Sequence, residues 1–244
     1  MNLRPFRYGL AVVVVFASTC IEASTTAPPD IVYLNGCVSN CALQAGVDDA
    51  INGKSTLVNG SVLLSAFPFS QATFDATAAC VRNVLKPYNA KVVIADPGAI
   101  PRREIMLTGS AATQIGLPGG TQNDAKLDGF PHDNTIALVF ASAIGASVDA
   151  LCWQAAQVIG NLYGLDFVTS CSDIMGSASG CGIKTFADQD SQCSGLVSGS
   201  PGHCILGNTT QNSGAVLMTT PGPSDIIFDN GAESFQQPAS SPSP

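Results

Sequence analysis

Charged side chains are scarce in this sequence and make up only 11% of its 244 residues. Ten are lysine or arginine and eighteen are aspartate or glutamate, so the formal net charge is −8. The few basic residues form no stripe of the kind that binds a phosphate backbone, which argues against a nucleic-acid partner. Apolar residues reach 45%, enough for a packed core, and the low fraction of charged residues also argues against a disordered chain.

Histidine is scarcer still, with only His132 and His203. Two imidazoles cannot supply a three-histidine zinc site, and the cysteines lack the paired C-x-x-C spacing of a cysteine zinc site. The aspartate pairs at 48/49 and 188/190 could touch a calcium ion, but neither lies in the full twelve-residue loop that would make such a site specific. We therefore expect no metal and no other cofactor.

The amino terminus has no apolar run long enough to span a bilayer, because its run covers only residues 10–17. Two arginines precede this run and small residues follow it, so residues 1–23 are typical of a signal peptide. Lipid attachment at Cys20 stays open as an alternative, although Thr19 matches that processing poorly. We expect a secreted or cell-envelope protein without a transmembrane segment.

Cysteines are numerous in the part of the chain that follows the expected signal peptide. Of the nine in the sequence, eight lie beyond the leader, and an even number in an exported chain predicts up to four disulfides. Eight cysteines allow 105 pairings, but the spacing favours three local links and one long one. The favoured pairs are Cys37 with Cys41, Cys171 with Cys181, Cys193 with Cys204, and Cys80 with Cys152.

Hydrophobic periodicity predicts several strands and two main helices, and therefore an α+β fold. Strands are expected at residues 31–34, 61–67, 91–95, 104–108 and 135–141, the last apolar on both faces and so buried. One helix is expected from residue 71, capped by Ser70 and closed by Pro87. The segments 40–60 and 116–131 are expected to be loops, and the cysteine-rich part after residue 167 to be irregular.

The second helix, predicted over residues 148–163, carries a polar stripe beside its apolar face. The stripe consists of Gln154, Gln157 and Asn161, at spacings i, i+3 and i+7. Gly164 follows directly and is well placed to end the helix in a left-handed turn.

The end of this helix has the layout of a zinc-protease motif. Metzincins carry H-E-x-x-H-x-x-G-x-x-H and, further on, a Met-turn. Laid over this segment, the glycine falls on Gly164 and the Met-turn methionine on Met175. The histidine positions hold Gln157, Asn161 and Phe167, and the position of the catalytic glutamate holds Val158.

The chain resembles secreted bacterial metzincins with a cysteine-rich C-terminal part, over about residues 30–215. The predicted order of strand, helix, strands, buried strand, helix and Met-turn is also that of this family, and the stretches 149–153 and 171–186 look similar to it. The resemblance implies a metzincin-like zincin fold with a mixed twisted sheet, in a metzincin-like subdomain at 24–167 and a cysteine-rich subdomain with the Met-turn at 168–222. The composition itself predicts the signal peptide at 1–23 and a low-complexity tail at 223–244.

The substitutions in the motif remove its chemistry. In metzincins the histidines grip zinc and the glutamate acts as general base on the metal-bound water. Amides are poor zinc ligands, a phenyl ring has no lone pair, and valine cannot transfer a proton. The resemblance therefore implies a metallopeptidase homologue without zinc or catalysis, whose cleft binds a peptide or protein.

Two other functions stay open from the sequence. One is an active secreted metallopeptidase whose metal site has been rebuilt, with Asp166 or Asp173 as a ligand. The other is a disulfide-stabilised extracellular structural protein, in which the metzincin likeness is only architectural.

Overall fold

A five-stranded sheet forms the centre of the computed structural model, which describes residues 27–176, 181–196 and 199–224. The strand order is β5-β1-β6-β8-β7, in a mixed α+β fold. Four strands are parallel, and β7 pairs antiparallel with β8 at one edge. The bounds are β1 Asp30–Asn35, β5 Ala90–Val93, β6 Arg103–Thr108, β7 Asn123–Asp124 and β8 Thr135–Phe140. The expected signal peptide, Cys20 and residues 225–244 of the expected tail lie outside the described residues.

Two long helices cover one face of this sheet, α1 (Gln71–Leu85) and α3 (Val148–Leu162). The sequence predicted both, and the hydroxyl of Ser70 caps α1 by accepting from Thr73 N at 3.1 Å. Alternate strand residues face the helices, and the core between them includes Val32, Ile105, Leu107, Val139, Phe74 and Ile159.

A small second sheet, in the order β3-β2-β4, packs on the opposite face. Its strands are β2 Cys41–Ala45, β3 Lys54–Ser55 and β4 Val62–Leu64, and a short 3-10 helix, η1 (Ala50–Asn52), precedes β3. The expectation that residues 40–60 form only loops is wrong. In β2 only Cys41 and Leu43 are buried, a period-two signal too short to stand out among the glycine, asparagine and aspartate around it.

The connections around β7 and β8 are short elements. These are the 3-10 helix η2 (Ala112–Ile115) before β7 and α2 (Ala141–Ile144) after β8. The segment 116–131 was expected to have no regular structure, yet it contains β7. A strand of two residues carries no periodicity of its own, and its pairing with β8 defines it.

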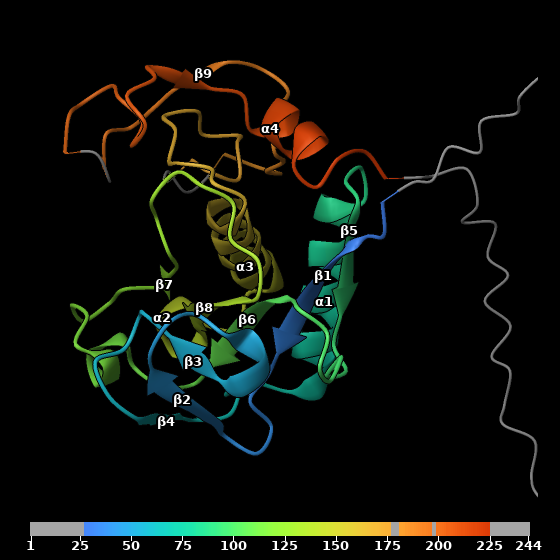
Figure 1. The fold of residues 1–244 in the computed structure, drawn as a ribbon, viewed down its shortest axis with the longest axis vertical. Coiled ribbons are helices and arrows are strands. Elements are labelled where there is room, and N and C mark those ends of the chain that lie inside the picture. Colours follow the sequence, from blue (N-terminus) through green and yellow to red (C-terminus); the bar gives the residue numbers. More distant parts are fainter. Residues whose placement is uncertain (1–26, 177–180, 197–198, 225–244) are drawn as a thin grey trace, which may run out of the picture.

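The cysteine-rich part lies at the end of the molecule opposite to the β2–β4 sheet, in orange to red (Figure 1). It contains the antiparallel pair β9 (Ser191–Gln192) and β10 (Thr210–Gln211), and α4 (Ser213–Thr219). The sequence did not predict α4, which is too short to show a periodic pattern and begins at an asparagine cap. All four favoured disulfides are present, namely Cys37–Cys41, Cys80–Cys152, Cys171–Cys181 and Cys193–Cys204.

Both ends of the described chain meet the segment between α1 and β5 (Figure 1). Asp30 N donates to Asn89 O at 3.0 Å, and Ser224 N donates to Pro87 O at 2.9 Å. Asn89 N in turn donates to Gly222 O at 2.8 Å. The first strand and the last described residues are therefore both hydrogen-bonded to the short segment 87–89. Within the described ranges, no helix has the length and apolar character needed to cross a membrane.

Candidate functional site

The sharp turn after α3 sets the position of the residues that follow it. Gly164 has a φ of 86°, in the left-handed region, as the sequence predicted. Leu165 N donates back to Gly160 O at 3.0 Å, and Gly164 N donates to Asn161 O at 2.9 Å. A Cβ on Gly164 would lie 2.9 Å from Gly129 O, so both the backbone angle and the available space require glycine.

Met175 packs directly against the last turns of α3. A Cβ on Gly160 would lie 2.5 Å from Met175 Sδ, so the absence of a side chain there lets the methionine approach the helix backbone. Met175 is fully buried, and its N–H donates to Asp173 Oδ1 at 2.8 Å. Gly176 N donates to Asp173 O at 2.9 Å, which closes a tight turn around the methionine.

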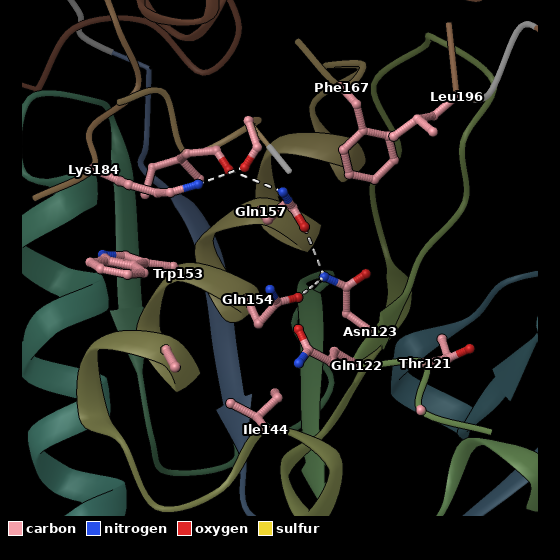
Figure 2. Close-up of a pocket in the computed structure, with 14 residues that line it drawn as sticks. Thr121, Gln122, Asn123, Ile144, Trp153, Gln154, Gln157, Phe167, Lys184 and Leu196 are labelled. Carbon is pink, nitrogen blue, oxygen red and sulfur yellow. Dashed lines mark hydrogen bonds between the residues drawn. The ribbon is translucent and has the colours of Figure 1, made fainter. Parts of the chain in front are cut away.

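A cavity of about 510 Å³ lies beside α3 (Figure 2). Its walls come from α3, from the edge strand β7 with the residues before it, and from the segments that follow α3 in the chain. The lining includes Asn123, Trp153, Gln154, Gln157, Phe167, Ile174, Lys184 and Leu196. This volume falls in the range of small-molecule and cofactor sites.

An amide network joins the edge strand to the helix inside this cavity. Asn123 Nδ2 donates to Gln157 Oε1 at 3.0 Å and also to Gln154 Oε1. Gln157 Nε2 donates to Ile174 O at 3.1 Å, beside the Met175 turn. Figure 2 shows Asn123 between the ends of the two glutamines. The network fixes the orientation of all three amides, because each hydrogen-bonding role is assigned by its partner.

The four residues at the positions of the zinc motif lie in different surroundings. Gln157 and Phe167 both line the cavity. Asn161 lies outside the described lining residues, is 3% exposed, and donates from Nδ2 to Leu165 O at 3.0 Å. Val158 is fully buried in the core between the helices and the sheet. Asn161 therefore stabilises the turn after the helix, and Val158 packs.

Lys184 is the one charged side chain among the described lining residues, and it is 5% exposed. Its Nζ donates to Gly176 O at 2.6 Å. Burial lowers the pKa of Lys184, while the charge of Asp173 acts in the opposite direction. Burial also raises the pKa of the Asp173 carboxyl, against the hydrogen bond from Met175 N. The cavity wall therefore combines neutral amides with one buried cation.

The aspartates considered as ligands of a rebuilt metal site are hydrogen-bonded elsewhere. Asp166 accepts from Phe167 N at 2.6 Å and from Ile205 N at 2.7 Å, and it tethers the turn after α3 to the cysteine-rich part. Asp173 holds the Met175 turn. Neither is among the described residues that line the cavity.

The histidines and the two aspartate pairs also lie outside that lining. His132 Nε2 lies 2.6 Å from Asp128 Oδ1, and His203 Nδ1 lies 3.2 Å from Pro201 O. Asp48 accepts from Thr56 N at 2.8 Å, and Asp49 accepts from Asn52 Nδ2 at 2.6 Å. Throughout the described ranges, no three histidine, cysteine or acidic side chains gather where they could hold a metal ion.

The chemistry that this cavity offers is hydrogen bonding, apolar contact and one positive charge. Its described lining contains no carboxylate, imidazole or thiol to act as a general base or nucleophile. The sequence identified Gln154, Gln157 and Phe167 by spacing. It did not single out Asn123 or Lys184, which come from other elements and meet the helix only in the folded chain.

Comparisons with known families, proteins and structures found no match to this chain. No protein-family model matches the chain, and neither a characterised protein nor a solved structure matches it.

Proposed function

We propose that this chain is a secreted, metzincin-like protein that no longer hydrolyses peptides and instead binds a peptide in the cavity beside α3. The observation that carries the proposal is the amide bridge from Asn123 to Gln157. In the proposed alignment Gln157 takes the place of the first zinc-binding histidine of a metzincin, and its amide is bonded to Asn123 instead. A second support is the packing of Met175 Sδ against Gly160, beneath the helix that would carry two of the three ligands.

The lining favours a peptide over other ligands. Asn123 belongs to β7, an edge strand whose pairing with β8 occupies only one of its sides. Edge strands and neutral amides both bind main-chain N–H and C=O groups. Trp153, Phe167 and Leu196 supply apolar wall for side chains, and Lys184 supplies a counter-charge for a carboxylate. A peptide with an acidic residue or a free carboxyl end fits this combination.

The test is to measure zinc, proteolysis and peptide capture on the same purified protein. We expect less than stoichiometric zinc by elemental analysis and no chelator-sensitive cleavage of casein. The immobilised protein should retain a subset of peptides from a tryptic digest of casein, identified by mass spectrometry. Stoichiometric zinc together with cleavage would contradict the proposal.

A variant that fills the cavity separates specific capture from adhesion to the surface. Gln154→Trp adds bulk at a half-buried lining position and should abolish capture of the retained peptides. The matched control is Gln44→Trp, which adds the same ring at an exposed position in β2. Equal capture by both variants would mean that the cavity is not the binding site.

A further inference from the structure

A second cavity, of about 240 Å³, lies where β1 and β5 end and α1 begins. Among the described residues it shares none of its lining with the cavity beside α3. Its walls include Tyr33, Asn35, Phe67, Phe69, Phe74 and Ile94. In open sheets with parallel strands, ligands bind in crevices beyond the carboxyl ends of the strands. Nothing in the function proposed above uses this cavity.

Aromatic rings form its walls, and their neighbours hold them in place. Phe67 packs edge-on against Phe69 and Phe74, with ring centroids 5.4 and 5.5 Å apart. Phe74 is only 7% exposed. The guanidinium of Arg102 lies over the Tyr33 ring, 5.4 Å from its centroid. Rings fixed in this way lose little freedom when another ring enters between them, which favours binding of an aromatic group.

One polar group on the wall has a fixed orientation. Asn35 Nδ2 donates to Glu104 Oε1 at 2.7 Å, and Asn35 Oδ1 accepts from Cys37 N at 2.8 Å. Glu104 is 3% exposed and is itself bound by Arg102 Nε at 3.1 Å. The amide therefore cannot flip without breaking two hydrogen bonds. Its carbonyl oxygen keeps one lone pair to accept from a ligand N–H or O–H.

We propose that this cavity binds a free, uncharged small aromatic molecule of one or two rings that carries a single N–H or O–H donor. The volume exceeds that of a cavity that takes up benzene, about 150 Å³. No charged side chain occurs among its described lining residues, so a charged ligand would lose its hydration without gaining a counter-charge. Val38 and Ile94, which are 84% and 41% exposed, extend the apolar surface at its rim.

The direct test is ligand-detected NMR with the whole secreted protein, using indole and indene as probes of the same shape. We expect indole to bind with a Kd on the order of 0.1 to 1 mM. Indene lacks the N–H and should bind about 3- to 10-fold more weakly. In Asn35→Leu this preference for indole should disappear, whereas binding of indene should persist.

The wall is tested by Phe69→Ala, which should weaken indole binding at least about fivefold because one ring contact is lost. The control is Leu63→Ala, which removes a 60% exposed apolar side chain outside the lining and should leave the Kd unchanged. If Phe69→Ala fails to fold, Ala66→Leu fills the cavity from a half-buried lining position and should abolish binding.

Three outcomes would overturn the proposal. The first is no binding of indole up to about 5 mM. The second is binding that Trp153→Ala removes and Phe69→Ala does not, which would place indole in the cavity beside α3. The third is tighter binding of N-acetyltryptophanamide than of indole, because the cavity would then receive an aromatic side chain of a polypeptide.

Discussion

At the scale of single residues, the partly buried carboxyl of Asp124 on the edge strand β7 makes the stability of the fold depend on pH. Burial raises the pKa of its carboxyl to about 6, and only the hydrogen bond from the Ala125 backbone lowers it. The folded protein therefore holds a proton on this side chain at a pH where the unfolded chain has lost it. Ionisation in the folded state costs stability, and this cost appears as the pH rises from about 4 through 6.

Replacing this carboxyl by an amide removes the cost, so we expect Asp124→Asn to be more stable than the wild type at pH 7.5. The gain should be about 1 to 2 kcal/mol after solvent screening is allowed for, and it should vanish at pH 4. Urea unfolding at the two pH values measures it. The control is Asp75→Asn at an exposed position on α1, and an equal gain at both pH values would contradict the assignment.

Lys184 and Asp173 illustrate how the site depends on buried charge. The ammonium donates to Gly176 O, and the Asp173 carboxylate accepts from Met175 N in the Met175 turn. Each charge lowers the cost of burying the other, since burial shifts their pKa values in opposite directions and their mutual attraction counters both shifts. The positive charge of the cavity is thus tied to the turn that supports α3.

At the scale of elements, the two long helices are joined by the disulfide Cys80–Cys152, which spans 72 residues. Cross-linking a loop of that length stabilises a fold by about 4 kcal/mol through the unfolded chain. The link between Cys37 and Cys41 spans only 4 residues, and the same reasoning gives about 2 kcal/mol.

We therefore expect the double variant Cys80→Ala with Cys152→Ala to lose about twice as much free energy of unfolding as Cys37→Ala with Cys41→Ala. Denaturant unfolding under oxidising conditions measures both, and each variant serves as the control for the other. A larger loss from the short link would show that strain or packing, rather than loop length, determines the contribution of these disulfides.

The elements that the sequence predicted are those with long or strong patterns. Helices α1 and α3 each carry an apolar stripe over 15 residues, and β8 is buried at every position. Strands β2 and β7 were missed because their signals are short and their hydrogen bonds come from neighbouring strands. In the same way, motif spacing predicted Gln157 and Phe167, whereas Asn123 is brought to Gln157 by the pairing of β7 with β8.

At the scale of the whole molecule, the proposed relationship to metzincins makes a specific demand. Helix α3, the turn at Gly164 and the Met175 turn must together be able to position three metal ligands. Restoring the imidazoles tests this directly. We expect Gln157→His with Asn161→His and Phe167→His to bind one zinc ion that survives dialysis, because three histidines would then occupy the spacing of the motif. The measurement is elemental analysis alongside circular dichroism.

The matched control moves one imidazole off the motif, with Gln154→His in place of Gln157→His. It should bind zinc more weakly although it has the same composition. Loss of the Phe167 ring can cost about 2 to 4 kcal/mol where that ring is packed, so the fold has to be checked first. A folded triple variant that binds no zinc would contradict the alignment with metzincins. It would not bear on the ligand proposed for the aromatic cavity at β1 and β5.

Residues 87–89 hold both β1 and the last described residues of the chain. A short peptide joining residue 27 to residue 224 could thus close the backbone into a ring without displacing a strand. Folds whose ends lie together commonly accept such rewiring. New termini could then be placed in an exposed loop elsewhere. The product would be a circular permutant with the same fold.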